Sequence, residues 1–221
     1  MTTMEEKEYH SEINKTRKAY VLKKCSDMLS ILCNPFLVPM FAFALLFAFT
    51  YLIIMPIQYM FSVLSIVFTF TFLAPVIFIC AYKWSYKLTF KEIDERKKRF
   101  IPYILIIMCY AACVLLMERL HFPHYFSSIL IATLLTMIAC YLLNLRWRIS
   151  THLAGCGMFI GGLTSYSLLF HFNPIWPLCG FILLSGIQGT ARISYHKHTL
   201  LEVIAGVVVG MFCSIIGILF I

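Results

Sequence analysis

The sequence predicts an all-α fold, a polytopic transmembrane helical bundle with six or seven spans. The chain of 221 residues is 61% hydrophobic and only 13% charged, far less charged than a soluble domain. Its apolar residues come in runs of about 20, long enough for a helix to cross a hydrocarbon core of roughly 30 Å. The runs show no strict alternation of apolar and polar positions, which argues against a transmembrane β-barrel.

Two parts of the chain differ in polarity. Residues 1–28 are polar and basic and predict a lead-in on the membrane surface, whereas residues 29–221 predict the transmembrane domain. The expected spans are residues 35–55, 60–82, 101–117, 127–144, 153–170, 177–193 and 200–221. Pro35 and Pro39 open the first of these, so it is expected to be bent or partly re-entrant. Six and seven crossings therefore both stay open.

The basic residues are distributed asymmetrically. All of the 18 Lys and Arg residues except Arg119 fall on the side of the predicted bundle that holds the N-terminus. The positive-inside rule places this side in the cytoplasm. The net charge of +8 is explained by juxtamembrane residues that meet anionic head groups. The polar segments are too short for a nucleic-acid-binding domain, so the expected partner is the bilayer, and the oligomeric state is left open.

A polar cluster on the basic side runs from Arg192 to Glu202. His198 and Glu202 are four residues apart at the start of an expected helix, so they share a face. A carboxylate there can fix the tautomer of the imidazole and raise its basicity. Arg192 lies six residues upstream and can bind an anion through two hydrogen bonds. The same spacing also fits a His–Glu pair that only tethers two helices.

A second cluster on this side is Ser150-Thr151-His152. Ser150 and Thr151 are expected to cap a helix that starts near His152. A helix N-terminus presents free N–H groups and partial positive charge, which suits a phosphate. The alternative is an interfacial histidine beside an ordinary cap.

A third cluster is the mixed-charge run that ends near Pro102. Arg96 and Arg99 are three residues apart and would share one helical face. For most of this run a solvated positive-inside loop is the simpler interpretation. Only two or three of its basic residues are expected to face a site.

Small residues follow both histidines. They are Gly155, Gly157, Gly161 and Gly162 after His152, and Gly206 and Gly210 after His198. Such spacing lets helices approach closely in a membrane. We therefore expect the two helices to pack together and to bring the two histidines to one place.

The motifs Arg192-x5-His198-x3-Glu202 and Ser150-Thr151-His152, with a basic motif near Pro102, resemble the type 2 phosphatidic acid phosphatase superfamily, and in particular its short bacterial membrane members. The resemblance covers about residues 30 to 215. The chain departs from the family pattern at several positions. In the stretch Arg192-x5-His198-x3-Glu202, Glu202 stands where the family has an Asp, and the preceding Ala191 stands where it has a Ser. Beside Ser150 and His152, Ile149 and Thr151 replace Pro and Gly. The family's basic motif has no full match near Pro102.

The resemblance implies roles for individual residues. His198 would attack phosphorus and form a phosphohistidine, Glu202 would orient His198, and His152 would protonate the leaving oxygen and then activate water. The phosphate oxygens would be held by Arg192, Ser150, Thr151, Arg96 and Arg99. The nine cysteines show no metal-ligand spacing, so neither a metal nor another cofactor is expected.

The expected function is hydrolysis of a lipid phosphate monoester or diphosphate in a membrane, which the resemblance suggests is a bacterial inner membrane. A lipid phosphotransferase would use the same intermediate but a different acceptor. A non-catalytic protein that binds lipid head groups is a third possibility. It predicts binding that survives replacement of His198 and no turnover.

Overall fold

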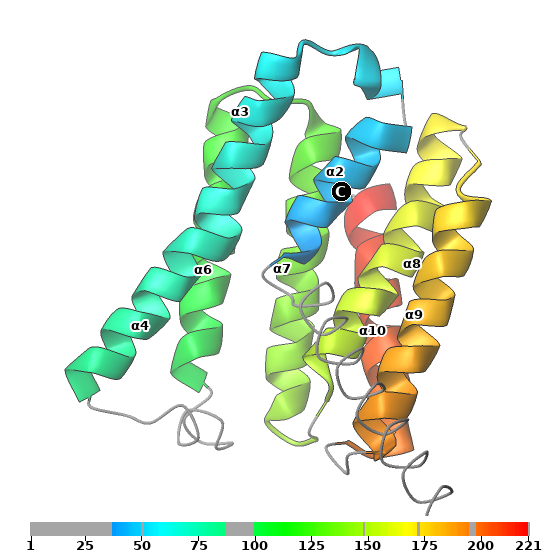
Figure 1. The fold of residues 1–221 in the computed structure, drawn as a ribbon. Helices are drawn as coiled ribbons and strands as arrows, with labels where there is room; N and C mark the ends of the chain where they lie inside the picture. Colours follow the sequence, from blue (N-terminus) through cyan, green and yellow to red (C-terminus); the bar gives the residue numbers. More distant parts are fainter. Residues whose placement is uncertain are drawn as a thin grey trace, which may run out of the picture.

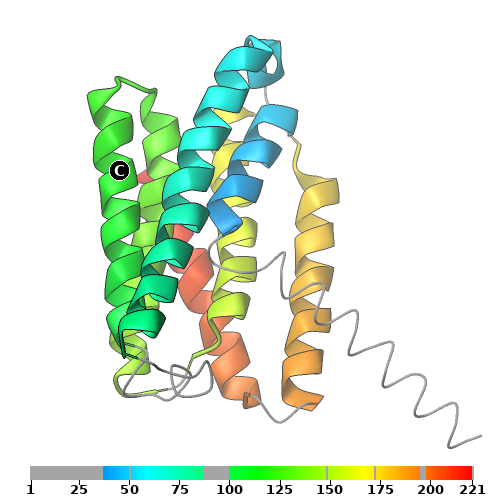
Figure 2. The same ribbon diagram turned by 60° about the vertical axis from the view of Figure 1, so that its left-hand side comes forward.

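The structure is a bundle of helices. The computed structural model describes residues 37–49, 51–86, 100–147, 149–171, 173–194 and 198–220. The elements in chain order are α2 (Val38–Phe49), η1 (Tyr51–Ile54), α3 (Ile57–Phe68), η2 (Thr69–Leu73), α4 (Ala74–Tyr86), α6 (Phe100–Arg119), α7 (His124–Asn144), α8 (Thr151–Phe170), α9 (Ile175–Ser194) and α10 (Leu200–Leu219). The long helices lie side by side (Figure 1, Figure 2). The predicted all-α class is confirmed for the described part of the chain.

Within the described residues, four helical stretches are long and apolar enough to cross a membrane. They are Ile57–Ser85, His124–Arg146, Thr151–Phe170 and Leu200–Leu219. A helix of 20 residues such as α8 spans about 30 Å, the thickness of a hydrocarbon core. These helices are consistent with an integral membrane protein. The count of six or seven spans stays a prediction.

The first predicted span contains a short helix. α2 has 12 residues, which gives a rise of about 18 Å, and the 3-10 turn η1 follows it. α2 alone is therefore too short to cross a bilayer. The expected lead-in, residues 1–28, lies outside the described residues.

α3 and α4 form one continuous rod through a π-helical segment, η2. Pro75 stands in the second position of α4. Proline has no N–H to donate, so the carbonyl one turn earlier loses its usual partner. The preceding N–H, that of Ala74, bonds the carbonyl of Thr69, a wider i→i+5 connection. The rod thus passes a proline without a break.

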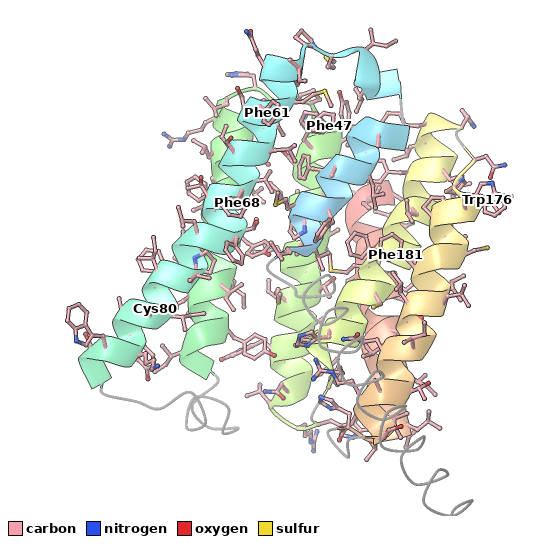
Figure 3. All side chains as sticks on the ribbon, viewed as in Figure 1. Phe47, Phe61, Phe68, Cys80, Trp176 and Phe181 are labelled. Atoms are coloured by element: carbon pink, nitrogen blue, oxygen red, sulfur yellow. The ribbon has the colours of Figure 1, made fainter. Side chains whose placement is uncertain are left out.

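The outer face of this rod is apolar. Figure 3 labels Phe61, Phe68 and Cys80 along the rod, and the side chain of Phe61 is 64% exposed. In a membrane protein such a face contacts lipid tails without cost.

α8 and α10 approach each other through glycines. A Cβ atom added to Gly210 would lie 2.0 Å from the carbonyl oxygen of Ala154, and one added to Gly157 would lie 2.1 Å from that of Val207. No side chain fits at such distances, so only glycine permits this contact. The predicted packing of the two histidine-bearing helices is confirmed.

An aromatic core fills the end of the bundle at which α7 begins, the upper end in Figure 1. Phe126 of α7 packs against Phe43 and Phe47 of α2, with ring centroids 5.4 Å and 5.6 Å away. The hydroxyl of Ser128 lies 2.9 Å from that of Tyr166, which joins α7 to α8. This end is closed by packing.

The other end of the bundle collects the helix ends that flank the predicted polar clusters. In Figure 1 the ends of α4, α7 and α9 and the starts of α6, α8 and α10 all lie at the lower end. Side chains with nitrogen atoms gather around the lower ends of α8, α9 and α10 in Figure 3. This shared end positions the candidate site.

Candidate functional site

A histidine–carboxylate pair lies at the start of α10, where His198 precedes the N-cap residue Thr199 and Glu202 is in the first turn. His198 Nδ1 lies 2.9 Å from Glu202 Oε2, and the two side chains are only 10% and 15% exposed. The spacing of four residues predicted this contact. A hydrogen bond from Nδ1–H to the carboxylate fixes the tautomer, so that Nε2 carries the lone pair. The pair is therefore arranged as an oriented nucleophile or base requires.

Glu202 has a second role that the helix start explains. Thr199 is the N-cap of α10, and its Oγ1 accepts from the N–H of Glu202 at 3.4 Å. Glu202 Oε2 in turn accepts from the N–H of Thr199 at 3.2 Å. This reciprocal capping box fixes the position of the Glu202 carboxylate that contacts the imidazole. The backbone at the start of α10 thus holds the hydrogen-bond partner of His198.

The start of α8 corrects one prediction. Ser150 stands at the N-cap with an extended backbone, but its side chain makes no capping hydrogen bond. Its Oγ is buried with no hydrogen-bond partner in the part of the chain that the structure describes, and the residue is 1% exposed. The backbone of Ser150 packs closely against α10, since its carbonyl oxygen lies 2.7 Å from the Cβ position of Gly206.

Thr151 and His152 occupy the first turn of α8 and are half-buried. The first N–H groups of a helix have no acceptor within the helix, and they point towards the end of the bundle. Together with the Ser150 hydroxyl they form a set of donors suited to an anion. His152 stands beside this set, as an acid for the leaving group would need to.

Arg192 lies in the last turn of α9 and is half-buried. A cation in the last turn is favourable because the helix C-terminus carries partial negative charge. Its guanidinium group can bind two oxygens of one phosphate.

Three helices meet directly beneath these residues. The Cβ position of Gly189 in α9 lies 3.0 Å from Val203 Cγ1 of α10 and 3.9 Å from Leu153 Cδ1 of α8. Arg192 is one turn beyond this junction. Glu202 and His152 are the immediate neighbours of Val203 and Leu153. The contact therefore brings the cluster Ser150-Thr151-His152 and the described residues of the cluster Arg192–Glu202 to one end of the bundle.

The mixed-charge run that ends near Pro102 cannot be placed in the same way. Its Arg96 and Arg99 lie outside the described residues. Their role in phosphate binding stays a prediction. The described residues contain no group of three or more His, Cys, Asp or Glu side chains that could hold a metal ion.

One buried polar residue near this site was not predicted. Gln188 of α9 is 0% exposed, and neither Nε2 nor Oε1 has a hydrogen-bond partner within the described ranges. The sequence carried a signal for it, because Gln188 lies four residues before Arg192 in an otherwise apolar run. Polar residues in a membrane helix are costly and commonly functional.

Comparisons of the chain with protein-family models, with curated proteins and with solved structures found no match. The arguments for function therefore rest on the residues themselves.

Proposed function

We propose that this chain is an integral-membrane lipid phosphatase of the type 2 phosphatidic acid phosphatase superfamily. It hydrolyses a lipid phosphate monoester or diphosphate through a phosphohistidine. The observation that carries the proposal is the 2.9 Å contact between His198 Nδ1 and Glu202 Oε2. It supports the proposal because it orients one ring nitrogen of His198 at the end of the bundle where Arg192 of α9 and His152 of α8 also lie.

The first half of the reaction transfers the phosphoryl group to the protein. Nε2 of His198 attacks phosphorus, and the bond to the lipid oxygen breaks as the N–P bond forms. His152, as imidazolium, gives its proton to the departing lipid oxygen. Glu202 balances the positive charge that develops on the ring of His198. The products are a phosphohistidine and a lipid alcohol, or a lipid monophosphate where the substrate is a diphosphate.

The second half releases phosphate. Neutral His152 takes a proton from a water molecule as the water oxygen attacks phosphorus, and the N–P bond breaks. His198 and the protonated His152 are thereby restored. Arg192, Ser150, Thr151 and the first N–H groups of α8 stabilise the charge on the phosphoryl oxygens, with Arg96 and Arg99 as further donors. The chemistry depends mainly on positioning and fixed positive charge.

Phosphate release tests this proposal. Purified protein in detergent is given a panel of lipid phosphates in EDTA, alongside His198→Ala. We expect release that needs no added metal and that disappears in the variant. A new phospholipid formed only when a second head group is supplied would instead indicate a phosphotransferase. Binding without turnover, equal in both proteins, would indicate a head-group-binding protein.

We further propose that the site faces the cytoplasm in a bacterial inner membrane, because the basic residues flank it. Single cysteines at position 194 or 173, in a variant that lacks the native cysteines, report the side. Ser194 and Asn173 are both exposed, and their helix ends lie at opposite ends of the bundle (Figure 1). In intact cells an impermeant thiol reagent should label position 173 and spare position 194. The reverse pattern would place the site outside.

A further inference from the structure

Gln188 is a buried amide that the proposed reaction does not use. The adjacent Ile187 is 47% exposed and Thr190 is also exposed, whereas Gln188 is 0% exposed. Its side chain therefore lies on the inward face of α9, which packs against α8 and α10. Both of its amide atoms lack a hydrogen-bond partner in the described part of the chain. An unpaired amide in an apolar environment is unfavourable, so this residue needs an explanation.

The position of Gln188 relates it to the proposed phosphate site. It precedes Gly189, which lies at the junction with Val203 and Leu153. It is four residues before Arg192 on the same helical face, and so about 6 Å further from the end of the helix. Ser150 Oγ is also buried without a hydrogen-bond partner among the described residues, and Ser150 is three residues before Leu153. The amide thus lies deeper in the membrane than the groups that would hold phosphate.

The chemistry of an amide restricts what can bind there. Its nitrogen donates and its oxygen accepts hydrogen bonds. A fully acylated glycerol offers only acceptors, and a prenyl chain offers neither kind of group. A free hydroxyl or an amide N–H with its carbonyl offers both. Among these lipid groups, only a free hydroxyl or an amide satisfies both ends of Gln188.

We propose that Gln188 binds the linkage group of the lipid next to its phosphate, and that it selects lipids with a free hydroxyl or an amide there. The inference rests on the proposed phosphatase function and adds a class of substrate to it. The linkage group next to a phosphate held by Arg192 would lie about one helical turn deeper in the membrane, at the depth of Gln188.

A matched pair of substrates tests this selectivity. One is a 1-acylglycerol 3-phosphate, and the other has the same acyl chain but lacks the 2-hydroxyl. An N-acyl ethanolamine phosphate adds an amide without a hydroxyl, and a prenyl phosphate has neither. The ratio of kcat/KM within the pair is measured for the unmodified protein, for Gln188→Met and for Gln58→Met. Gln58 is exposed at the start of α3 and serves as the control.

We expect the unmodified protein to prefer the hydroxyl-bearing lipid by about tenfold or more, since the analogue leaves a buried amide unpaired. Gln188→Met should bring the ratio close to one, and Gln58→Met should keep it. The kcat/KM of the N-acyl ethanolamine phosphate shows whether Gln188 accepts an amide as well as a hydroxyl. An unchanged ratio in Gln188→Met would overturn the inference, as would a prenyl phosphate that is hydrolysed as fast as the hydroxyl lipid.

Failure of the proposed function is distinguishable from failure of this inference. If no lipid releases phosphate, the phosphatase proposal fails. Binding of non-hydrolysable phosphonates of the same pair, measured by calorimetry, then tests Gln188 alone. A preference that is lost in Gln188→Met supports the inference, and equal binding of both phosphonates refutes it. Gln188→Met should unfold at the same or a higher temperature, because the amide has no partner to lose.

Discussion

The rod formed by α3, η2 and α4 and the helix α8 are both apolar, yet they are buried to different extents. In the most apolar stretch of the rod 22% of the residues are buried, whereas in α8 61% are buried. The mean hydropathy runs the other way, at 2.5 for the rod and 1.5 for α8. In lipid, apolar side chains gain little from leaving the hydrocarbon, so close backbone contact decides what is buried. Glycine contacts join α8 to α10. Function is expected where this packing fixes polar groups.

The largest expected effect separates histidines at the two ends of the bundle. His198→Ala removes the proposed nucleophile and should lower kcat by about 10⁴-fold or more. His124→Ala alters an exposed histidine at the start of α7, at the opposite end, and should leave kcat unchanged. Steady-state phosphate release measures both variants. Equal activity in the two would place the chemistry elsewhere.

The next effect separates the two roles of Glu202. Glu202→Gln keeps an oxygen for the capping box but removes the negative charge, so kcat should fall by about 100-fold or more. Thr199→Ala removes the cap acceptor at 3.4 Å from the Glu202 N–H and should cost about 1 kcal/mol of stability with most of the activity kept. Thermal unfolding and kcat are measured for both. If loss of the cap reduced kcat as much as loss of the charge, Glu202 would act only by holding the helix start.

The third effect concerns the packing that distinguishes α8. Gly210→Ala places a methyl group 2.0 Å from the Ala154 carbonyl oxygen, whereas a Cβ at Gly186 in α9 meets nothing within 4 Å. We expect the first to lower the free energy of unfolding by about 3 kcal/mol. Gly186→Ala should be neutral or stabilise the helix by up to about 1 kcal/mol. Denaturant unfolding in mixed micelles measures the difference. Similar stability in both variants would show that α8 and α10 are less closely packed.

The smallest effect compares two buried hydroxyls, one in each region. Ser150 and Thr71 both bury an oxygen without a hydrogen-bond partner among the described residues. Ser150→Ala and Thr71→Val should therefore leave stability unchanged or raise it slightly. Only Ser150→Ala should lower kcat/KM, by about tenfold, because only that hydroxyl lies beside the proposed phosphate. A similar loss in Thr71→Val would remove the distinction between the regions.

The features set by local spacing could be predicted from the sequence. Apolar runs predicted the helices, and the interval of four residues predicted the contact of His198 with Glu202. The expected shared helical face was wrong, because His198 precedes the N-cap residue Thr199 and the contact forms across the start of α10. The glycines after His152 and His198 predicted the contact of α8 with α10. These inferences needed only the geometry of one helix or a stripe of small residues.

The features set by tertiary contacts could not be predicted. Ser150 was expected to cap α8, but its backbone packs against Gly206 and its hydroxyl has no hydrogen-bond partner among the described residues. The burial of Gln188 depends on how α9 meets α8 and α10. The π-helical segment before Pro75 also differs from a simple span. The roles of Arg96 and Arg99 stay predictions, since both lie outside the described residues.

In the proposed reaction His198 carries the phosphoryl group and His152 activates the water that releases it. Trapping of the intermediate tests this most directly. A ³²P-labelled lipid diphosphate, whose leaving group needs little protonation, is mixed with the protein and quenched in alkali, where phosphohistidine survives. We expect label on His198 that accumulates in His152→Ala and is absent in His198→Ala. Label on another residue, or steady turnover without any labelled protein in His152→Ala, would contradict it.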